Sequence, residues 1–202
     1  MRVLLPKYCR SVCIALLGSA LPWGGWAQSV STTTITATVV ASSCVGRVVT
    51  GLQHSSGDTV DFGVINPKIR TAPVRTFSLL LSEYEGGETG CSAFEAYRRV
   101  QNVATLTFGD LSQTQLDTQG VVTRYSDDAA SPVRVRVVPT NSEAQFVLSG
   151  GPGYITSGFN QIQYPIDFAA RGQFDFSATL VGLESARAGA FSGTLTLTVV
   201  YR

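Results

Sequence analysis

Few side chains in this sequence are of the types that perform catalysis or bind metal ions. The single histidine, His54, lies in a polar stretch that continues to Asp58, and this composition is typical of an exposed loop. One histidine excludes a histidine-rich metal site and the metalloprotease motif. No Gly-x-Ser-x-Gly turn and no glycine-rich phosphate loop is present. We therefore predict that the protein is not an enzyme and has no cofactor.

The carboxylates form two small groups, at Glu83, Glu85 and Glu88 and at Asp127–Asp128. Carboxylates that converge from distant strands could act as a general acid and base, and Asp127–Asp128 could contact calcium. The spacing of a known calcium-binding loop is missing, however. We interpret both groups as solvated loop charges.

Residues 1–27 have the three-part pattern of a secretory signal peptide. A basic stretch is followed by an apolar run, Val12–Leu21, and then by small residues up to Ala27. The apolar run is too short for a membrane-spanning helix, which needs roughly 20 residues. Arg10 also places a charge in front of Cys13, where a lipoprotein signal needs an apolar residue. We expect cleavage after Ala27, export, and a mature chain that does not span the membrane.

The charge balance excludes several classes of partner. The 202 residues include 15 basic and 14 acidic side chains, and residues 1–27 account for three of the basic ones and none of the acidic ones. The exported chain therefore has 12 basic and 14 acidic side chains and a formal net charge of −2. With no run of like charges, it carries no electrostatic signature of binding to nucleic acid or to an anionic membrane surface.

The cysteines indicate one disulfide. Two of the four, Cys9 and Cys13, belong to the expected signal peptide, which leaves Cys44 and Cys91 as a pair in an exported protein. A single disulfide between them is the natural expectation. Two free thiols or a metal-binding pair would be the alternative, but neither has a nearby histidine or a third cysteine to support it.

The chain that must position these residues alternates mostly between apolar and polar side chains. Ile35, Ala37 and Val39 alternate with threonines, and Phe191–Tyr201 alternates in the same way near the other end. A period of two predicts strands with one buried face. Further runs of this kind, separated by turn residues, are Thr59–Ile65, Thr76–Leu81, Ala104–Phe108, Val121–Tyr125, Val133–Val138, Ile162–Phe168 and Gln173–Leu183.

The same pattern predicts little helix and no second domain. Ser92–Val103 has helical spacing of apolar residues and could form one short helix. Arg134 and Arg136 alternate with buried valines and are expected on a solvated sheet surface. Many short strands with turn signals favour an all-β fold, an antiparallel sandwich of the immunoglobulin-like kind.

At several points the chain resembles a pilin subunit of the chaperone-usher (type 1 fimbria-like) family. The matching features include the order and spacing of the two cysteines, a glycine 13 residues before the end and a penultimate tyrosine. The residues that carry the resemblance are Val39–Cys44, Val60–Gly63, Cys91, Ile166–Arg171, Gly189 and Tyr201. The resemblance covers residues 28–202, although Ser82–Gly90 separates the strand Thr76–Leu81 from the second cysteine more widely than is usual in the family.

The resemblance implies an incomplete immunoglobulin-like sandwich that a donor strand completes. Residues 1–27 would be the signal peptide, 28–41 a donor-strand extension running into the first strand, and 42–202 the pilin domain. The inserting face of the extension would consist of Ser31, Thr33, Ile35, Ala37 and Val39. The edge of the groove, which the chaperone also reads, would consist of Gly189, Phe191, Leu195, Leu197, Val199 and Tyr201.

The resemblance also implies the partners: a periplasmic pilus chaperone, an outer-membrane usher and neighbouring pilin subunits. The protein would be a structural fimbrial subunit that supports adhesion at the surface of a Gram-negative bacterium. The polar donor face favours a minor or adaptor subunit. A tip-located adhesin that binds a host glycan or protein receptor is the alternative, although Trp23 and Trp26 leave with the signal peptide. The alternation itself is equally compatible with ordinary strands of a complete sandwich.

Overall fold

The structure is a computed structural model of the whole chain, and it describes residues 29–39, 44–50, 59–65, 72–98, 100 and 102–200. The expected signal peptide, His54 and Tyr201 lie outside the described residues. The elements are β1 (Ser29–Val39), β2 (Val45–Thr50), β3 (Thr59–Ile65), β4 (Arg75–Ser82), α1 (Ser92–Tyr97), β5 (Val103–Phe108), β6 (Leu116–Asp117), β7 (Gly120–Tyr125), β8 (Ala130–Pro139), β9 (Gln145–Phe146), β10 (Gln161–Pro165), α2 (Ile166–Ala169), β11 (Gln173–Val181), the 3₁₀ turn η1 (Leu183–Ser185) and β12 (Phe191–Val200).

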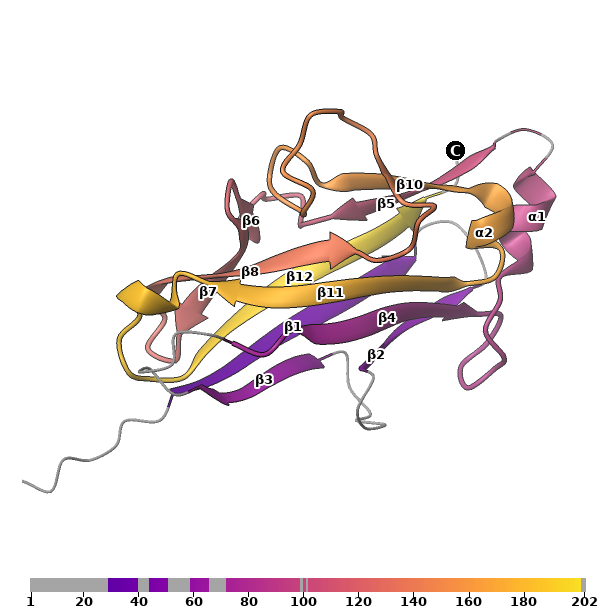
Figure 1. Cartoon of the computed structure of the whole chain (residues 1–202). Helices are drawn as coiled ribbons and strands as arrows, with labels where there is room; N and C mark the ends of the chain where they lie inside the picture. Colours follow the sequence, from indigo (N-terminus) through magenta and orange to yellow (C-terminus); the bar gives the residue numbers. More distant parts are fainter. Residues whose placement is uncertain are drawn as a thin grey trace, which may run out of the picture.

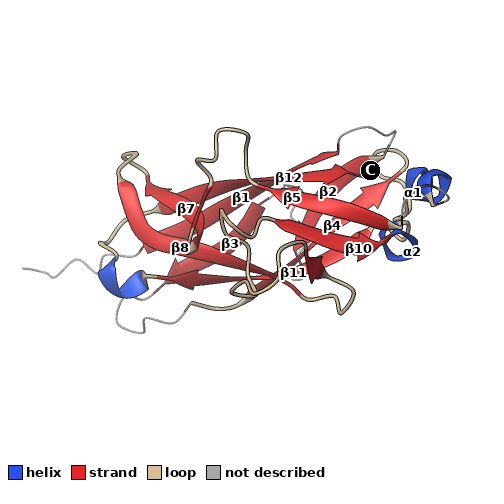
Figure 2. Ribbon diagram, turned by 90° about the horizontal axis from the view of Figure 1, so that it is seen from above, coloured by secondary structure: helices blue, strands red, loops and turns tan. Residues whose placement is uncertain are grey.

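The strands of the described part join into one large, mostly antiparallel sheet. Its order is β2-β4-β11-β8-β7-β12-β5-β10-β9, with β6 beside β7 and with β1 lying between β12 and β3 (Figure 1). The pairing of β1 with β12 is parallel, in contrast to the antiparallel pairing between the other strands. Figure 2 shows that the two short helices, α1 and α2, lie at the same end of the molecule.

The sheet curves so that distant strands face each other across the core. Phe108 on β5 meets Phe176 on β11 edge to face, with ring centroids 5.6 Å apart, although β8, β7 and β12 separate these strands in the sheet. Tyr164 on β10 meets Phe174 on β11 at 5.0 Å in the same manner. All four rings are fully buried, and aromatic pairs of this geometry stabilise a core beyond the area they bury.

The predicted strands are confirmed in type, and their bounds differ where a turn residue intervenes. The run Ile162–Phe168 ends as a strand at Pro165, which caps the helical turn α2. The run to Leu183 ends at Val181, because Gly182 takes a left-handed conformation with φ of 80°. An added Cβ at Gly182 would lie 2.4 Å from the carbonyl oxygen of Pro132, so glycine is required there.

The short helix expected within Ser92–Val103 is present as α1, which ends at Tyr97, and Val103 already begins β5. One expectation needs correction. The two arginines of β8 are not simply solvated. Arg134 donates to Asp117 at 2.5 Å and to the carbonyl oxygen of Ser131, and the Arg136 guanidinium lies 4.5 Å from the centre of the Tyr154 ring.

Candidate strand-acceptor site

The last strand, β12, has a clean division between its two faces. Its buried side chains are Phe191, Leu195, Leu197 and Val199, while Ser192 and Thr194 are exposed. This is the division that its alternating sequence predicts, because successive side chains in a strand point to opposite faces. The row of apolar groups lies along the strand that pairs with β1.

Gly193 interrupts the apolar row where β12 changes partners. The strand pairs with β7 at Phe191 and Ser192, and with β5 from Leu197 onward. A Cβ at Gly193 would lie 2.7 Å from the carbonyl oxygen of Val122 on β7, so the close approach of these strands depends on glycine. The backbone N–H of Thr196 is held by the side chain of Gln115 at 2.6 Å where the partner changes.

Strand β12 borders one strand position in the sheet, and β3 forms the opposite wall of that position. The sequence analysis did not assign β3 to this place. Val60, Phe62 and Ile65 on this strand are buried. The spacing changes from two to three residues because Gly63, with φ of 71°, lies between Phe62 and Ile65. The register of β1 against β3 shifts at the same place, as expected of a β-bulge.

Strand β1 fills the position between these two walls (Figure 1). It pairs with β12 in nine consecutive residue pairs, from Ser31 with Phe191 to Val39 with Val199. It also pairs with β3 in six residue pairs, with the register shift between Ser31 and Thr32. β1 therefore supplies a backbone partner to β12 and to β3 at once.

The structure brings the two predicted sets of residues together within one chain. The register sets each residue of the predicted inserting face directly beside a residue on the buried side of β12. The pairs are Ser31 with Phe191, Thr33 with Gly193, Ile35 with Leu195, Ala37 with Leu197 and Val39 with Val199. Gly189 lies two residues before β12, in a backbone conformation with φ of 147°.

An anchor that the sequence pattern did not predict holds the start of β12. The Tyr125 hydroxyl accepts a hydrogen bond from the Arg187 N–H at 2.9 Å, and the Arg187 guanidinium lies 4.3 Å from the centre of the same ring. Arg187 also donates to the Asp127 carboxylate, and this bond holds the pKa of Asp127 below its usual value. Tyr125 meets Phe191 edge to face at 6.4 Å. No short sequence pattern links these residues, because Tyr125 and Arg187 are 62 residues apart in the chain.

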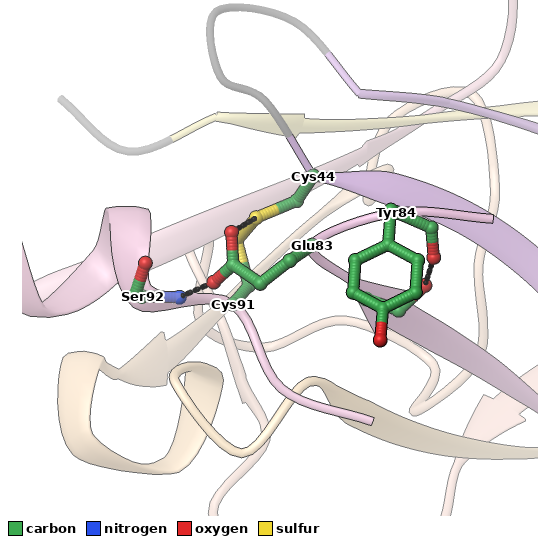
Figure 3. Close-up of a disulfide and its surroundings, with 6 residues drawn as sticks. Cys44, Glu83, Tyr84, Cys91 and Ser92 are labelled. Atoms are coloured by element: carbon green, nitrogen blue, oxygen red, sulfur yellow. Dashed lines mark hydrogen bonds between the residues drawn. A yellow bond between two sulfur atoms is a disulfide. The ribbon is translucent and has the colours of Figure 1, made fainter. Parts of the chain in front are cut away.

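The cysteine pair forms the predicted disulfide just after β1 in the chain. Cys44 precedes β2 and is bonded to Cys91 at the start of α1, with the two Cα atoms 5.9 Å apart (Figure 3). Both cysteines are buried. Val39, the last residue of β1, is five residues before Cys44. The disulfide therefore holds the carboxyl-terminal end of β1 close to β2 and α1.

The Glu83 carboxylate makes structural contacts beside the disulfide. Its Oε1 accepts the Ser92 N–H at 2.5 Å, and this bond holds the pKa of Glu83 below its usual value. Its Oε2 lies 3.9 Å from the Cys44 sulfur (Figure 3), a contact rather than a hydrogen bond because a disulfide sulfur carries no proton. Ser82–Gly90, the unusually long connection, is closed by a bridge between Ser82 and Thr89.

Among the residues that the structure describes, no three His, Cys, Asp or Glu side chains gather in a way that could hold a metal ion. Asp127, considered above as a calcium contact, bonds Arg187 instead. The described helices include none that is long and apolar enough to cross a membrane.

Comparison with known protein families identifies the family of this chain. The family model described as K88 fimbrial protein A matches residues 13–202. The chain belongs to the K88 fimbrial protein A family. This is a family of chaperone-usher fimbrial subunits, and its members are structural proteins rather than enzymes. No curated protein matches the sequence.

Family membership indicates the partners and the cellular location of the subunit. A K88-family fimbrial subunit assembles with other pilin subunits and belongs to a cell-surface fimbria of Gram-negative bacteria. The fold agrees with this setting, since it is β-rich with one disulfide between Cys44 and Cys91.

Proposed function

We propose that this subunit is linked into its fimbria by donor-strand exchange. The strand position between β12 and β3 is the acceptor site, and residues 28–41 are the donor extension of the pilin domain, residues 42–202. The observation that carries the proposal is the register of β1: its residues pair with both walls of the site, and the inserting face matches the buried side of β12.

The physical reason is that the acceptor site is costly to leave empty. Without a strand there, β12 would lack a backbone partner along one edge, and β3, which pairs only with β1 among the described strands, would lack a strand partner altogether. The buried residues Leu195, Leu197 and Phe62 lie on these two strands. Open edges with apolar side chains promote aggregation, and unpaired backbone groups away from water are unfavourable. A periplasmic chaperone would fill the site first, and a neighbouring subunit's extension would replace it at the outer-membrane usher by strand addition.

This interpretation treats the fold as an immunoglobulin-like sandwich that is incomplete without β1. The two parts of the sheet that meet through Phe108 and Phe176 would be its layers. Because donor and acceptor are different surfaces, each contact between subunits is heterologous and leaves one free site at each end. Such contacts generate an open fibre rather than a closed ring.

The composition of the donor extension supports a minor or adaptor position. Of the 11 residues of β1, only Val30, Ile35, Ala37 and Val39 are apolar. A polar donor strand buries little apolar area, and the hydrophobic contribution to binding scales with that area. A subunit that occurs a few times in a fibre tolerates a weaker link better than one repeated along the whole shaft.

Removing residues 29–39 in the bacterium tests this function. The shortened subunit is expected to accumulate with its chaperone but to disappear from fibres or to remain only at their ends, because it has no strand to donate. Immunogold labelling of fibres measures incorporation, and blotting of the periplasm controls for export. Normal decoration by the shortened subunit would contradict strand donation, and uniform decoration of the shaft by the unaltered subunit would contradict the minor position.

A further inference from the structure

In the single chain the acceptor site is filled by the chain's own amino-terminal strand. We propose that the subunit has a closed monomeric form, in which β1 caps its own site and which neither donates nor accepts a strand until β1 withdraws. The inference rests on the proposed function and adds a regulated state to it: a subunit that has left its chaperone would be held inactive rather than left to aggregate.

The ladder that closes the monomer is continuous. β1 is parallel to β12 over nine residue pairs without a register shift, and it meets β3 on its other side. Occupation of the site by β1 uses the same backbone groups of β12 and β3 that an incoming strand would need. The same segment also cannot be offered to a neighbour while it is paired in this way. One contact therefore blocks both activities.

The tether favours closure at low subunit concentration. The Cys44–Cys91 disulfide fixes the chain five residues after Val39, so β1 cannot move far from its own acceptor site. A segment tethered this closely to its own binding site has an effective concentration in the millimolar range, well above that of separate subunits in dilute solution. The chain's own strand is thus the first competitor for the site.

The same strand is suited to release. Seven of its 11 residues are serine or threonine, and a parallel ladder is slightly less stable per residue than an antiparallel one. A chaperone strand or a more apolar donor strand is therefore able to displace it. Closure would be reversible, and assembly from the closed form would be limited by the rate at which β1 opens.

Uptake of a labelled peptide separates the closed form from an open site. The probe is a fluorescein-labelled peptide with the sequence of residues 29–39, and its binding to the purified subunit is followed by fluorescence anisotropy. For the unaltered subunit, the uptake rate is expected to level off as peptide concentration rises, because opening becomes limiting. The plateau is the quantity compared between variants.

Ile35→Asp and Thr34→Asp form the matched pair. Ile35 is in register with Leu195, which is fully buried, whereas Thr34 is in register with Thr194, which is exposed. Both substitutions add the same charge to the tail and leave β12 and β3 intact. We expect Ile35→Asp to raise the plateau about tenfold or more, since a carboxylate beside a buried row is unfavourable, and Thr34→Asp to change it less than about twofold.

The outcomes distinguish this inference from the proposed function. If Ile35→Asp lowers incorporation into fibres but leaves peptide uptake unchanged, the closed form is wrong while strand donation stands. Uptake that rises linearly with peptide concentration and is equal in all three proteins would also overturn closure. Faster uptake by Ile35→Asp alone supports it, because a tail that served only as a donor would not affect its own chain's acceptor site.

Cross-linking tests the register independently of any destabilised variant. The parallel register sets Thr38 beside Thr198 and Thr32 beside Ser192, while the crossed combinations lie six residues apart along the strands, about 20 Å. A short bismaleimide should link T38C/T198C and T32C/S192C within one chain, at monomer mass, and should not link T32C/T198C or T38C/S192C. Links only in the crossed combinations, or only between chains, would overturn the closed form.

Discussion

Leu197→Asp is expected to abolish recovery of the folded subunit from the periplasm. Leu197 lies on β12, is fully buried and pairs with Phe108 on one side and Ala37 on the other. An unpaired carboxylate at such a position costs more than about 4 kcal/mol, whereas a whole domain is stable by only about 5–15 kcal/mol. The measurement is the amount of soluble subunit bound to its chaperone, together with its thermal midpoint if any is recovered.

The neighbouring residue provides the control. Thr198 lies on the opposite face of β12 and is half-buried, so Thr198→Asp should change stability by less than about 1 kcal/mol. Leu197→Ala should fall between them, at about 2–5 kcal/mol, because it removes a buried side chain without introducing a charge. Equal yields of the two aspartate variants would show that the apolar face of β12 is not where the structure places it.

Loss of the disulfide is the second large effect that we expect. Replacing both Cys44 and Cys91 with serine opens a loop with a sequence separation of 47 residues, which should cost up to about 4 kcal/mol on the chain-entropy model. For a chain of this size that corresponds to a fall in the thermal midpoint of about 8–16 °C. Differential scanning calorimetry of the oxidised subunit and of the double variant measures the difference.

A control separates the bond from the side chains. The unaltered subunit, kept reduced and scanned under the same conditions, should melt close to the double serine variant, because each lacks the cross-link. An unchanged midpoint in the double variant would mean that the bond between β2 and α1 does not contribute to stability.

The elements that the sequence predicts best are the strands with one buried face. β12 alternates over its whole length, and its buried residues are the odd-numbered apolar ones that the pattern indicates. The disulfide was also predictable, because only one cysteine pair remains after the expected signal peptide. The strand follows from the local alternation of side chains, and the disulfide follows from the number of cysteines that remain.

The errors arise where backbone geometry or a contact from a distant part of the chain overrides composition. Ile166 and Phe168 suit a strand by residue type, yet Pro165 starts a helical turn that Ala170 closes. Arg136 alternates with valines as a surface residue would, but Tyr154, from a distant loop, covers it. The sequence of the loop alone gives no sign that it folds back onto β8.

An alternating sequence does not specify which strand a given strand pairs with, or whether the pairing is parallel or antiparallel. The pattern of Ile35, Ala37 and Val39 fits a strand that inserts into a neighbouring subunit, and it equally fits a strand that pairs within its own chain. Only the register against β12 and β3 shows that the amino-terminal segment fits both walls of one site. That β3 forms the second wall depends on the bulge at Gly63, which shifts Ile65 onto the buried side.

Identifying which chain supplies the strand in the assembled fibre tests the central claim most directly. A subunit labelled with heavy isotopes, with a photo-cross-linking amino acid at position 34, would be assembled among an excess of unlabelled subunits of the same fimbria, and the linked peptides sequenced by mass spectrometry. Strand exchange predicts heavy tail peptides joined to unlabelled partners from another chain. Tail peptides joined only to the heavy chain's own β12 would contradict it, because each subunit would then remain closed within the fibre.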